Sequence, residues 1–254
     1  MIIPESEMFR HVRERAGTGF WEGWPDCDTL TEMAKGLTNS RGRQILFVDD
    51  EGRDYESRIY LKGEIQTRKN SCHDLFNALV WMTFPKAKAC LNSIHFHEMA
   101  KEAGHRGKAR DIATHFDESG VIVATSDEAL SAKLQNFEWH SLFWENRRKV
   151  LEEMRFFMFG HGLLEKALSP FMGLTGNGLV FPVEKQFFSR SLNAQLAILD
   201  ESFEIRYSKI EKTRDFSPVP LLGYPGWMTE NSEEAFYLNE SYFRKGRRSG
   251  MGRF

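Results

Sequence analysis

The sequence has only three cysteines, no long apolar run and no apolar leader, and each of these absences excludes a class of protein. Cys27, Cys72 and Cys90 are too few and too scattered for a disulfide framework, and no CxxC pair indicates a zinc ribbon. The densest apolar stretch, residues 78–82, is far shorter than the ~20 residues that a membrane helix needs. Residues 1–19 mix acidic and basic side chains and lack the apolar segment of a signal peptide. We therefore expect a cytoplasmic protein with reduced thiols and no membrane partner.

An excess of charge of one sign is also missing. There are 34 Lys and Arg residues against 36 Asp and Glu residues, which gives a formal net charge of −2. This balance disfavours a protein that coats DNA non-specifically, although a local basic patch stays compatible with it. The 41% of hydrophobic residues excludes collagen-like, coiled-coil and wholly disordered classes, and 254 residues can bury a substantial core.

What is present is a mixed pattern of apolar residues, which predicts an α+β fold: one mainly helical domain with a few short strands or hairpins and an irregular C-terminal tail. We expect helices through residues 75–82, 86–103, 127–136, 137–153, 160–168 and 192–205. We expect strands at 44–48, 55–65 and 120–124, the second with a bulge at Gly63, whereas residues 156–159 suit either a strand or a helix end. Residues 116–120 are typical of a hairpin turn, and Gly173, Gly176 and Gly178 of a loop.

The same pattern suggests three parts of the chain. Residues 1–43 form an N-terminal lead-in packed on the core, and residues 44–217 form the α+β core. Residues 218–254 form an irregular tail rich in Pro, Gly and Trp with a basic end, because prolines and glycines at 218–226 preclude a helix there.

Polar residues gather where the first long helix is expected to begin, in the segment from Thr67 to Asn77. His73 and Asn77 are four residues apart and therefore share one helical face. His73 and Asp74 both carry lone pairs that suit a hard or borderline metal ion, and free N–H groups at a helix start favour anions. The alternative is an ordinary capped helix start, in which the acid complements the helix dipole.

A second cluster is His115-Phe-Asp117-Glu118-Ser-Gly120. Two carboxylates beside a tight turn and close to a histidine could serve a divalent ion or act as a general base. The same residues would also suit a plain hairpin turn, with glycine supplying a positive φ.

The third cluster is Gly160-His161-Gly-Leu-Leu-Glu165. On a helix, His161 and Glu165 lie one turn apart and can face one ligand or each other, and the glycines on either side of the histidine permit close approach. The alternative is a buried histidine that simply pairs with the glutamate. In contrast, His95 and His97 alternate within an expected helix and point to different faces, which is poor geometry for a shared ligand.

Several blocks of the sequence resemble one family. They are Thr67-Arg-x-Asn70-x-x-His73-Asp74-Leu-Phe-Asn77-Ala-Leu-x-Trp81, Phe116-Asp-Glu-x-Gly120, Phe159-Gly-His-x-Leu-x-Glu165 and Leu222-Gly-x-Pro-Gly-Trp227. Together they are similar to the signature of an uncharacterised proteobacterial family, a domain of unknown function. The resemblance extends from about residue 44 to the C-terminus and implies no particular activity.

These clusters lead to one principal hypothesis, a cytoplasmic metal-dependent hydrolase that acts on a phosphoester, with a small phosphorylated molecule as its substrate. Two or three residues of a set of six would hold a divalent metal ion: His73, Asp74, Asp117, Glu118, His161 and Glu165. The residues named as its ligands are His73, Asp117, His161 and Glu165. The residues expected to carry the chemistry are His73, Asp74, Glu118 and His161. Arg68, Asn70 and Asn77 would orient the substrate. The hypothesis requires three blocks that are distant in sequence to meet in space.

Two alternatives stay open at this point. One is a non-catalytic module that binds nucleic acid or a protein partner through the Pro-Gly-Trp tail and the basic residues Arg41, Arg43, Arg53, Arg58, Arg68, Lys101, Arg106, Lys108 and Arg110. The other is a small-molecule enzyme without metal, in which His161 and Glu165 act as an acid–base pair.

Overall fold

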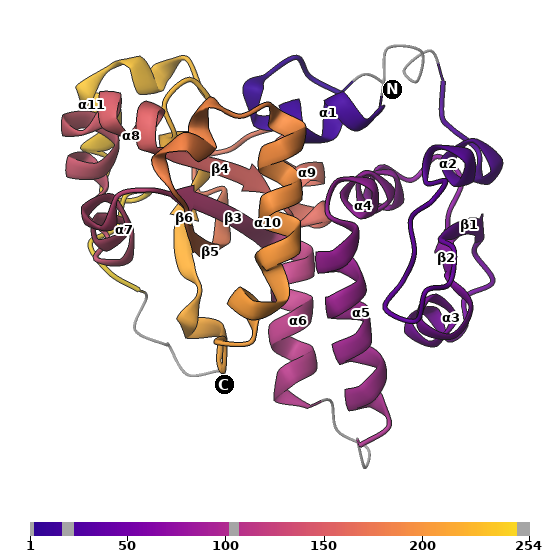
Figure 1. The fold of residues 1–254 in the computed structure, drawn as a ribbon. Helices are drawn as coiled ribbons and strands as arrows, with labels where there is room; N and C mark the ends of the chain where they lie inside the picture. The colour runs from indigo at the N-terminus through magenta and orange to yellow at the C-terminus, as the bar shows by residue number, and fades with distance from the viewer. Residues whose placement is uncertain (1–2, 17–22, 102–106, 248–254) are drawn as a thin grey trace, which may run out of the picture.

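The computed structural model describes residues 3–16, 23–101 and 107–247, which form one mixed α+β domain that is mainly helical, as predicted (Figure 1). In chain order its helices are α1 (Arg10–Ala16), α2 (Cys27–Met33), α3 (Tyr55–Lys62), α4 (Cys72–Thr83), α5 (Pro85–Met99), α6 (Lys108–Ser119), α7 (Glu128–Gln135), α8 (Arg147–Glu153), α9 (His161–Ala167), α10 (Leu192–Tyr207) and α11 (Glu234–Tyr237). The strands are β1 (Leu46–Asp49), β2 (Glu64–Thr67), β3 (Gly120–Thr125), β4 (Met154–Met158), β5 (Thr175–Pro182) and β6 (Ser217–Pro220). A π-helix, Ser141–Glu145, precedes α8.

A four-stranded sheet with the order β4-β3-β5-β6 forms the centre of the molecule. β3 runs parallel to β5 and antiparallel to β4, and β6 is antiparallel to β5. Every residue of β3 is buried, as expected for a central strand with the continuous apolar run Val121–Ala124. Helices α6 and α10 pack against β5, and α5 runs beside α6 and α10 (Figure 1).

Two carbonyl groups of the edge strand β4 accept hydrogen bonds from side chains. His11 of α1 donates from Nε2 to the Met158 carbonyl at 2.7 Å, and the Tyr224 hydroxyl donates to the Met154 carbonyl at 3.0 Å. These two contacts replace part of a missing neighbouring strand and join both ends of the chain to the sheet.

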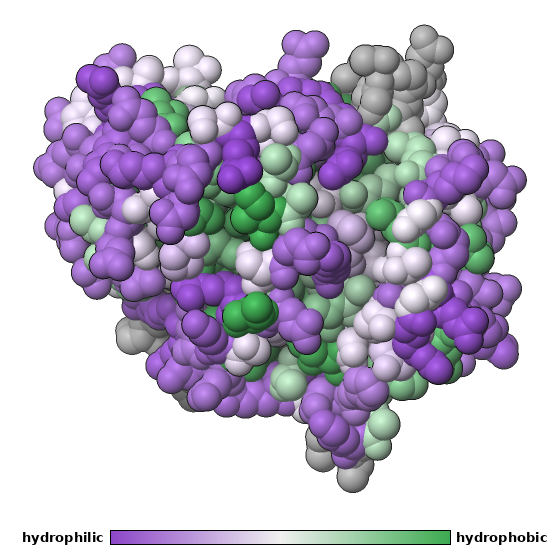
Figure 2. Space-filling view, viewed as in Figure 1, coloured by the Kyte–Doolittle hydropathy of each residue, from purple (hydrophilic) through white to green (hydrophobic). Residues whose placement is uncertain are grey.

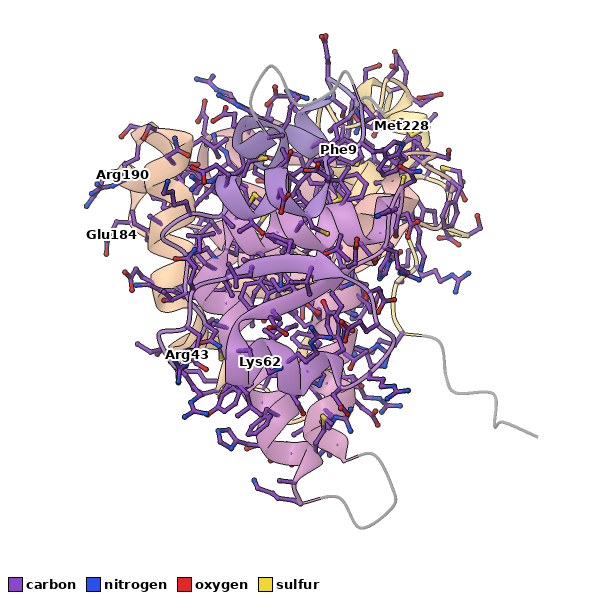
Figure 3. The ribbon with its side chains drawn as sticks, turned by 90° about the vertical axis from the view of Figure 1, so that its right-hand side faces the viewer. Phe9, Arg43, Lys62, Glu184, Arg190 and Met228 are labelled. Atoms are coloured by element: carbon purple, nitrogen blue, oxygen red, sulfur yellow. The ribbon has the colours of Figure 1, made fainter. Side chains whose placement is uncertain are left out.

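A smaller unit of two parallel strands, β1 and β2, carries α2 and α3 (right of Figure 1). The prediction of one strand across residues 55–65 is wrong, because α3 fills residues 55–62 before β2 begins. Gly63 is the C-cap of α3 with φ of 83° and not a bulge in a strand. A Cβ at this position would lie 2.0 Å from the carbonyl oxygen of Gln44, so the glycine lets β2 leave the helix against the preceding chain. Arg43 and Lys62 are labelled beside this turn in Figure 3.

The loop predicted around Gly173, Gly176 and Gly178 is wrong over its second half, where the chain forms β5. A Cβ at Gly176 would lie 2.4 Å from Val121 of β3, and one at Gly178 would lie 2.6 Å from Val219 of β6. The two glycines therefore mark close packing of neighbouring strands and not a turn.

The hairpin turn predicted at residues 116–120 is also wrong. These residues form the last turn of α6, which runs directly into β3, and Gly120 has an ordinary negative φ of −68°. The residues before β3 are thus helical, and its sheet partners are β4 and β5. As a result the two carboxylates of this segment stand on a helix end.

The remaining predicted helices, and the segment that suited either a strand or a helix end, can be compared with the structure in the same way. The helix expected through residues 75–82 is α4, and Pro85 opens α5 at its N1 position. The ambiguous residues 156–159 contribute a strand, β4, while the helix expected at 137–153 divides into the π-helix and α8. The helix expected at 86–103 is α5, which ends at Met99, before the predicted end; residues 102–103 lie outside the described part of the chain.

The segment after residue 217 is irregular but packed. It begins inside β6, whose prolines suit an edge strand, and then forms short 3-10 turns and α11. The fully buried Asn231 donates to the carbonyl groups of Leu222 and Tyr224 at 2.9 and 2.7 Å. At the other end of the chain, Phe9 (labelled in Figure 3) stacks on Phe76 of α4.

The face shown in Figure 2 is largely hydrophilic, with small hydrophobic areas between the polar side chains. In the described ranges we find no helix with the length and apolar character needed to cross a membrane.

Candidate metal centre

Three helix ends meet at one point of the structure. His73 is the second residue of α4, Glu118 is the second-last residue of α6, and His161 is the first residue of α9. The sequence blocks that carry the three clusters are therefore adjacent in space, with α4 and α6 each packed against α9.

One side-chain atom of each residue lies within 4.8 Å of the other two. Glu118 Oε1 is 3.5 Å from His161 Nε2 and 3.8 Å from His73 Nε2. Donor atoms at ~2.1 Å from a tetrahedral zinc ion are about 3.4 Å apart, so this spacing suits three ligands of one ion. His161 is nearly enclosed, whereas the side chains of His73 and Glu118 are 31% and 46% exposed. An ion held here would thus be open on one side.

The glycines on either side of His161 allow α9 to approach the end of α6. A Cβ at Gly160 would lie 2.5 Å from the Cα of Ser119, which is backbone and cannot move aside easily. A Cβ at Gly162 would lie 2.4 Å from Glu118 Oε2, the mobile end of a side chain. The Gly-His-Gly sequence is therefore needed for the contact that brings His161 to Glu118.

A carboxylate faces the second ring nitrogen of each histidine. Glu165 Oε2 lies 3.1 Å from His73 Nδ1, and Asp117 Oδ2 lies 3.9 Å from His161 Nδ1. Carboxylates in this position orient the imidazoles of many metal sites and leave the opposite nitrogen for the ion. Asp117 and Glu165, both predicted as ligands, thus lie behind the histidines and not between them.

A buried lysine holds one of these carboxylates. Lys88 of α5 is 4% exposed, and its Nζ lies 2.5 Å from Asp117 Oδ1. Burial alone would raise the pKa of Asp117, but the Lys88 ammonium and then the His161 ring outweigh it and lower this pKa. The approach of His161 is the main reason that the pKa of Glu118 is lowered as well.

The candidate ligands open into a cavity of about 390 Å³. Its lining is polar and rich in acidic groups: Asp50, Tyr55, Glu56, Gln66, Arg68, His73, Asp74, Asn77, His95, Arg110, Thr114, Asp117, Glu118 and His161. Two arginines are the only groups in this lining that carry a fixed positive charge, so the cavity suits a cation together with an anionic group.

Of the residues predicted to bind or react, Asp74 and Arg68 pair with each other. The guanidinium donates from Nε and Nη2 to the two carboxylate oxygens at 2.9 and 2.7 Å. Burial would raise the pKa of Asp74, but this pairing lowers it. Asp74 thereby fixes Arg68 at the cavity wall and does not face the histidines as a ligand.

The two predicted asparagines are in different places. Asn77 lines the cavity and donates from Nδ2 to the Tyr55 hydroxyl at 2.7 Å, and its Oδ1 is buried with no hydrogen-bond partner in the described ranges. Asn70 is exposed, with φ of 57°, and lines a neighbouring cavity together with Trp24 and Lys69.

Sequence reasoning missed the side chains that α3 and α5 contribute. Burial raises the pKa of Glu56 to about 7, and Asn92 donates to its carboxylate at 2.7 Å. Lys88, Asn92 and His95 follow the helical spacing i, i+4 and i+7 and are all buried. Polar residues at the buried positions of a helix are a signal that could have found them.

Several residues on which the two alternative hypotheses depend make other contacts in the structure. Arg58 pairs with Glu51 and Glu64, which occupies one of the arginines proposed for nucleic acid. Trp227 of the Pro-Gly-Trp segment is buried against Phe156. Within the described ranges Glu165 contacts His73 at the distance given above, and no ion pair joins it to His161. Arg106 lies outside the described part of the chain.

Fold and site together define a mixed α+β protein with a candidate His-His-Glu metal centre between three helix ends. The chain belongs to the family described as "Protein of unknown function (DUF3025)", which matches residues 45–247. This confirms the predicted membership of an uncharacterised family, and the matched residues include the three polar clusters. No curated protein and no solved structure shows a significant match to the chain.

Proposed function

We propose that this protein is a metal-dependent hydrolase that acts on phosphoesters. The observation that carries the proposal is the convergence of one atom each from His73, Glu118 and His161 within 4.8 Å, at the wall of an open polar cavity. Structural zinc sites are closed by four protein ligands, whereas catalytic sites hold the ion with three and keep a position open. Three ligands beside a cavity fit the catalytic type.

The chemistry of the three candidate ligands favours some metal ions over others. Two imidazoles and one carboxylate suit zinc, iron, manganese or cobalt better than calcium or magnesium, which prefer oxygen ligands. Such an ion lowers the pKa of water and polarises an ester oxygen when it is bound.

The remaining residues of the cavity supply binding and proton transfer in this proposal. Arg68, fixed by Asp74, presents positive charge to a phosphate, and Arg110 lines the same cavity. Asn77 would orient the substrate by accepting from one of its hydroxyl groups through Oδ1, which has no hydrogen-bond partner among the described residues. Glu56, with a pKa of about 7, suits a general acid or base near neutral pH.

Hydrolysis of simple chromogenic phosphomonoesters and phosphodiesters tests the proposal, with zinc, manganese or cobalt added to metal-stripped protein. We expect metal-dependent turnover that falls at least ~10²-fold in Glu118→Gln and in His161→Ala, because each change removes a ligand. The matched control is Glu145→Gln, which changes a carboxylate that contacts a histidine elsewhere, His140. Activity that is independent of added metal, or equal in all variants, would contradict the proposal.

A further inference from the structure

The pair formed by the buried Lys88 and the partly buried Asp117, whose side chains are 4% and 23% exposed, has no use in the proposal so far. Lys88 comes from α5 and Asp117 from α6, two helices that lie side by side (Figure 1). A charge taken out of water, such as that of Lys88, costs several kcal/mol, and an apolar pair of similar size is often as stable or more so. Stability alone therefore does not account for a charge pair at this position.

The pair is placed behind the most enclosed candidate ligand. His161 is 6% exposed, and its Nδ1 is buried without a hydrogen-bond partner in the described residues. The carboxylate oxygen that faces this nitrogen is Asp117 Oδ2, at 3.9 Å. The other oxygen of the same carboxylate accepts from Lys88, so one oxygen is occupied and the second is directed at the histidine.

The protonation of the imidazole decides whether it can bind an ion. A neutral histidine carries its proton on one nitrogen only, and a metal binds the nitrogen that lacks it. Coordination through Nε2 requires the proton on Nδ1. In the metal-free protein Glu118 Oε1, 3.5 Å from Nε2, would accept a proton on that side, so the carboxylate of Asp117 has to compete with it. A buried N–H without a nearby acceptor is costly, whereas a carboxylate beside it stabilises that tautomer.

We infer that Lys88 and Asp117 are positioning residues that hold His161 in the Nδ1–H tautomer and so keep Nε2 free for the ion. Lys88 fixes the carboxylate from its far side, and Asp117 fixes the imidazole. This inference rests on the proposed metal site and adds a residue, Lys88, that contacts no candidate ligand directly.

Asp117→Asn gives the sharpest test because it retains the shape of the side chain. Lys88 can only donate, so the amide oxygen must turn toward Lys88 and the amide N–H group toward His161. His161 would then accept at Nδ1 and carry its proton on Nε2, which blocks coordination. We expect zinc or cobalt affinity to fall about 10- to 100-fold, the usual cost of losing a residue behind a ligand.

A second variant, Lys88→Met with Asp117→Leu, removes both charges and leaves no unpaired ion in the core. It should unfold as cooperatively as the wild type and show a similar loss of affinity, because Nδ1 again lacks an acceptor. The matched control is Asp127→Asn, which makes the same change in the Lys149–Asp127 pair at the other end of β3. The control should bind the ion like the wild type.

Two readouts separate this inference from the proposed function. Nitrogen-15 NMR of the metal-free protein, about two pH units above the ordinary histidine pKa of ~6.5, reports which His161 nitrogen carries the proton. Titration with zinc or cobalt reports affinity. A wild type that shows the Nδ1–H tautomer but binds no ion would overturn the proposed metal site and leave the positioning role intact. Folded variants that keep the wild-type tautomer and affinity would overturn the inference alone.

Discussion

Gly160 and Gly162 flank His161, and a methyl group at each position would meet a different obstacle. At Gly162 it meets the mobile carboxylate of Glu118 at 2.4 Å and comes within 3.2 Å of the Glu118 carbonyl oxygen, whereas at Gly160 it meets the backbone of Ser119 at 2.5 Å. The same substitution at two neighbouring sites therefore separates a change in the site from a change in the fold.

We predict that Gly162→Ala displaces the Glu118 carboxylate and lowers metal affinity by at least ~10-fold while the free energy of unfolding changes by under ~1 kcal/mol. Gly160→Ala should instead cost about 1–3 kcal/mol of stability, because backbone must move. Zinc titration and urea unfolding of both variants check this. Equal effects on affinity and stability in the two variants would speak against the described contact between α9 and α6.

A second residue-scale prediction concerns His11, which is buried and donates to the edge strand β4. Burial lowers the pKa of His11 to about 4, so the folded protein keeps it neutral while the unfolded chain takes up a proton at a pKa of ~6.5. Between these values the unfolded state binds more protons. Stability is therefore lost as the pH falls from about 6.5 to about 4, by up to ~3 kcal/mol from this group.

His11→Gln keeps a donor for the Met158 carbonyl but cannot titrate. The variant should lose less stability than the wild type over the same pH interval, as measured by urea unfolding at several pH values. Parallel stability curves for the two proteins would show that His11 does not bind protons differently in the folded and unfolded states.

At the scale of elements, the long helices with many apolar residues and a clear start could be predicted from sequence. α4 combines a Ser71 cap with apolar residues on all sides, and α10 begins at a similar cap, Ser191. The errors occur where a tertiary contact decides the local structure. From sequence alone Gly176 is typical of a loop, and only its contact with Val121 explains why it lies in a strand. Apolar and polar side chains alternate in residues 55–62 well enough to suit a strand, although these residues form α3.

The start of α5 shows such a tertiary contact in detail. Its N-cap, Phe84, offers no side-chain acceptor, and Asp200 of α10 accepts instead from the N–H groups of Lys86 and Ala87 at 3.1 and 2.8 Å. Capping across two helices cannot be predicted from the sequence near Pro85.

We predict that Asp200→Ala costs about 1–2 kcal/mol, since it removes the acceptor for two N–H groups. Burial raises the pKa of Asp200 to about 6, so the folded state holds its proton longer than the unfolded chain does. Its contribution to stability therefore decreases as the pH rises from about 4 to about 6. Asp200→Asn keeps an acceptor and should lack this decrease; pH-dependent urea unfolding checks both variants, and a decrease unchanged in Asp200→Asn would contradict the assignment.

At the scale of the whole molecule, the candidate site depends on a convergence that no local pattern contains. The three clusters could be recognised from residue types, but the sequence could not show that His73, Glu118 and His161 meet, nor that Asp117 and Glu165 stand behind the histidines. These positions depend on how the ends of α4, α6 and α9 are placed relative to one another. The roles given to these residues in binding and catalysis stay proposals.

Because the three candidate ligands come from α4, α6 and α9, a bound ion would connect elements from across the fold. We predict that zinc raises the free energy of unfolding by about 2.7 kcal/mol at 100 times its dissociation constant, as expected for any ligand of the folded state alone. Thermal unfolding with and without zinc measures this. An unchanged midpoint under saturating zinc would mean that the ion does not bind the folded protein preferentially.

The most direct test of a metal centre is the metal content of protein purified without chelator and without a nickel column. Wild type, His161→Ala and His140→Ala should be analysed together, because His140 also contacts glutamates but lies outside the proposed site. We predict near-stoichiometric transition metal in the wild type and in His140→Ala, and its loss in His161→Ala. A wild type that contains no metal and takes up none of the added zinc, manganese or cobalt would contradict the account.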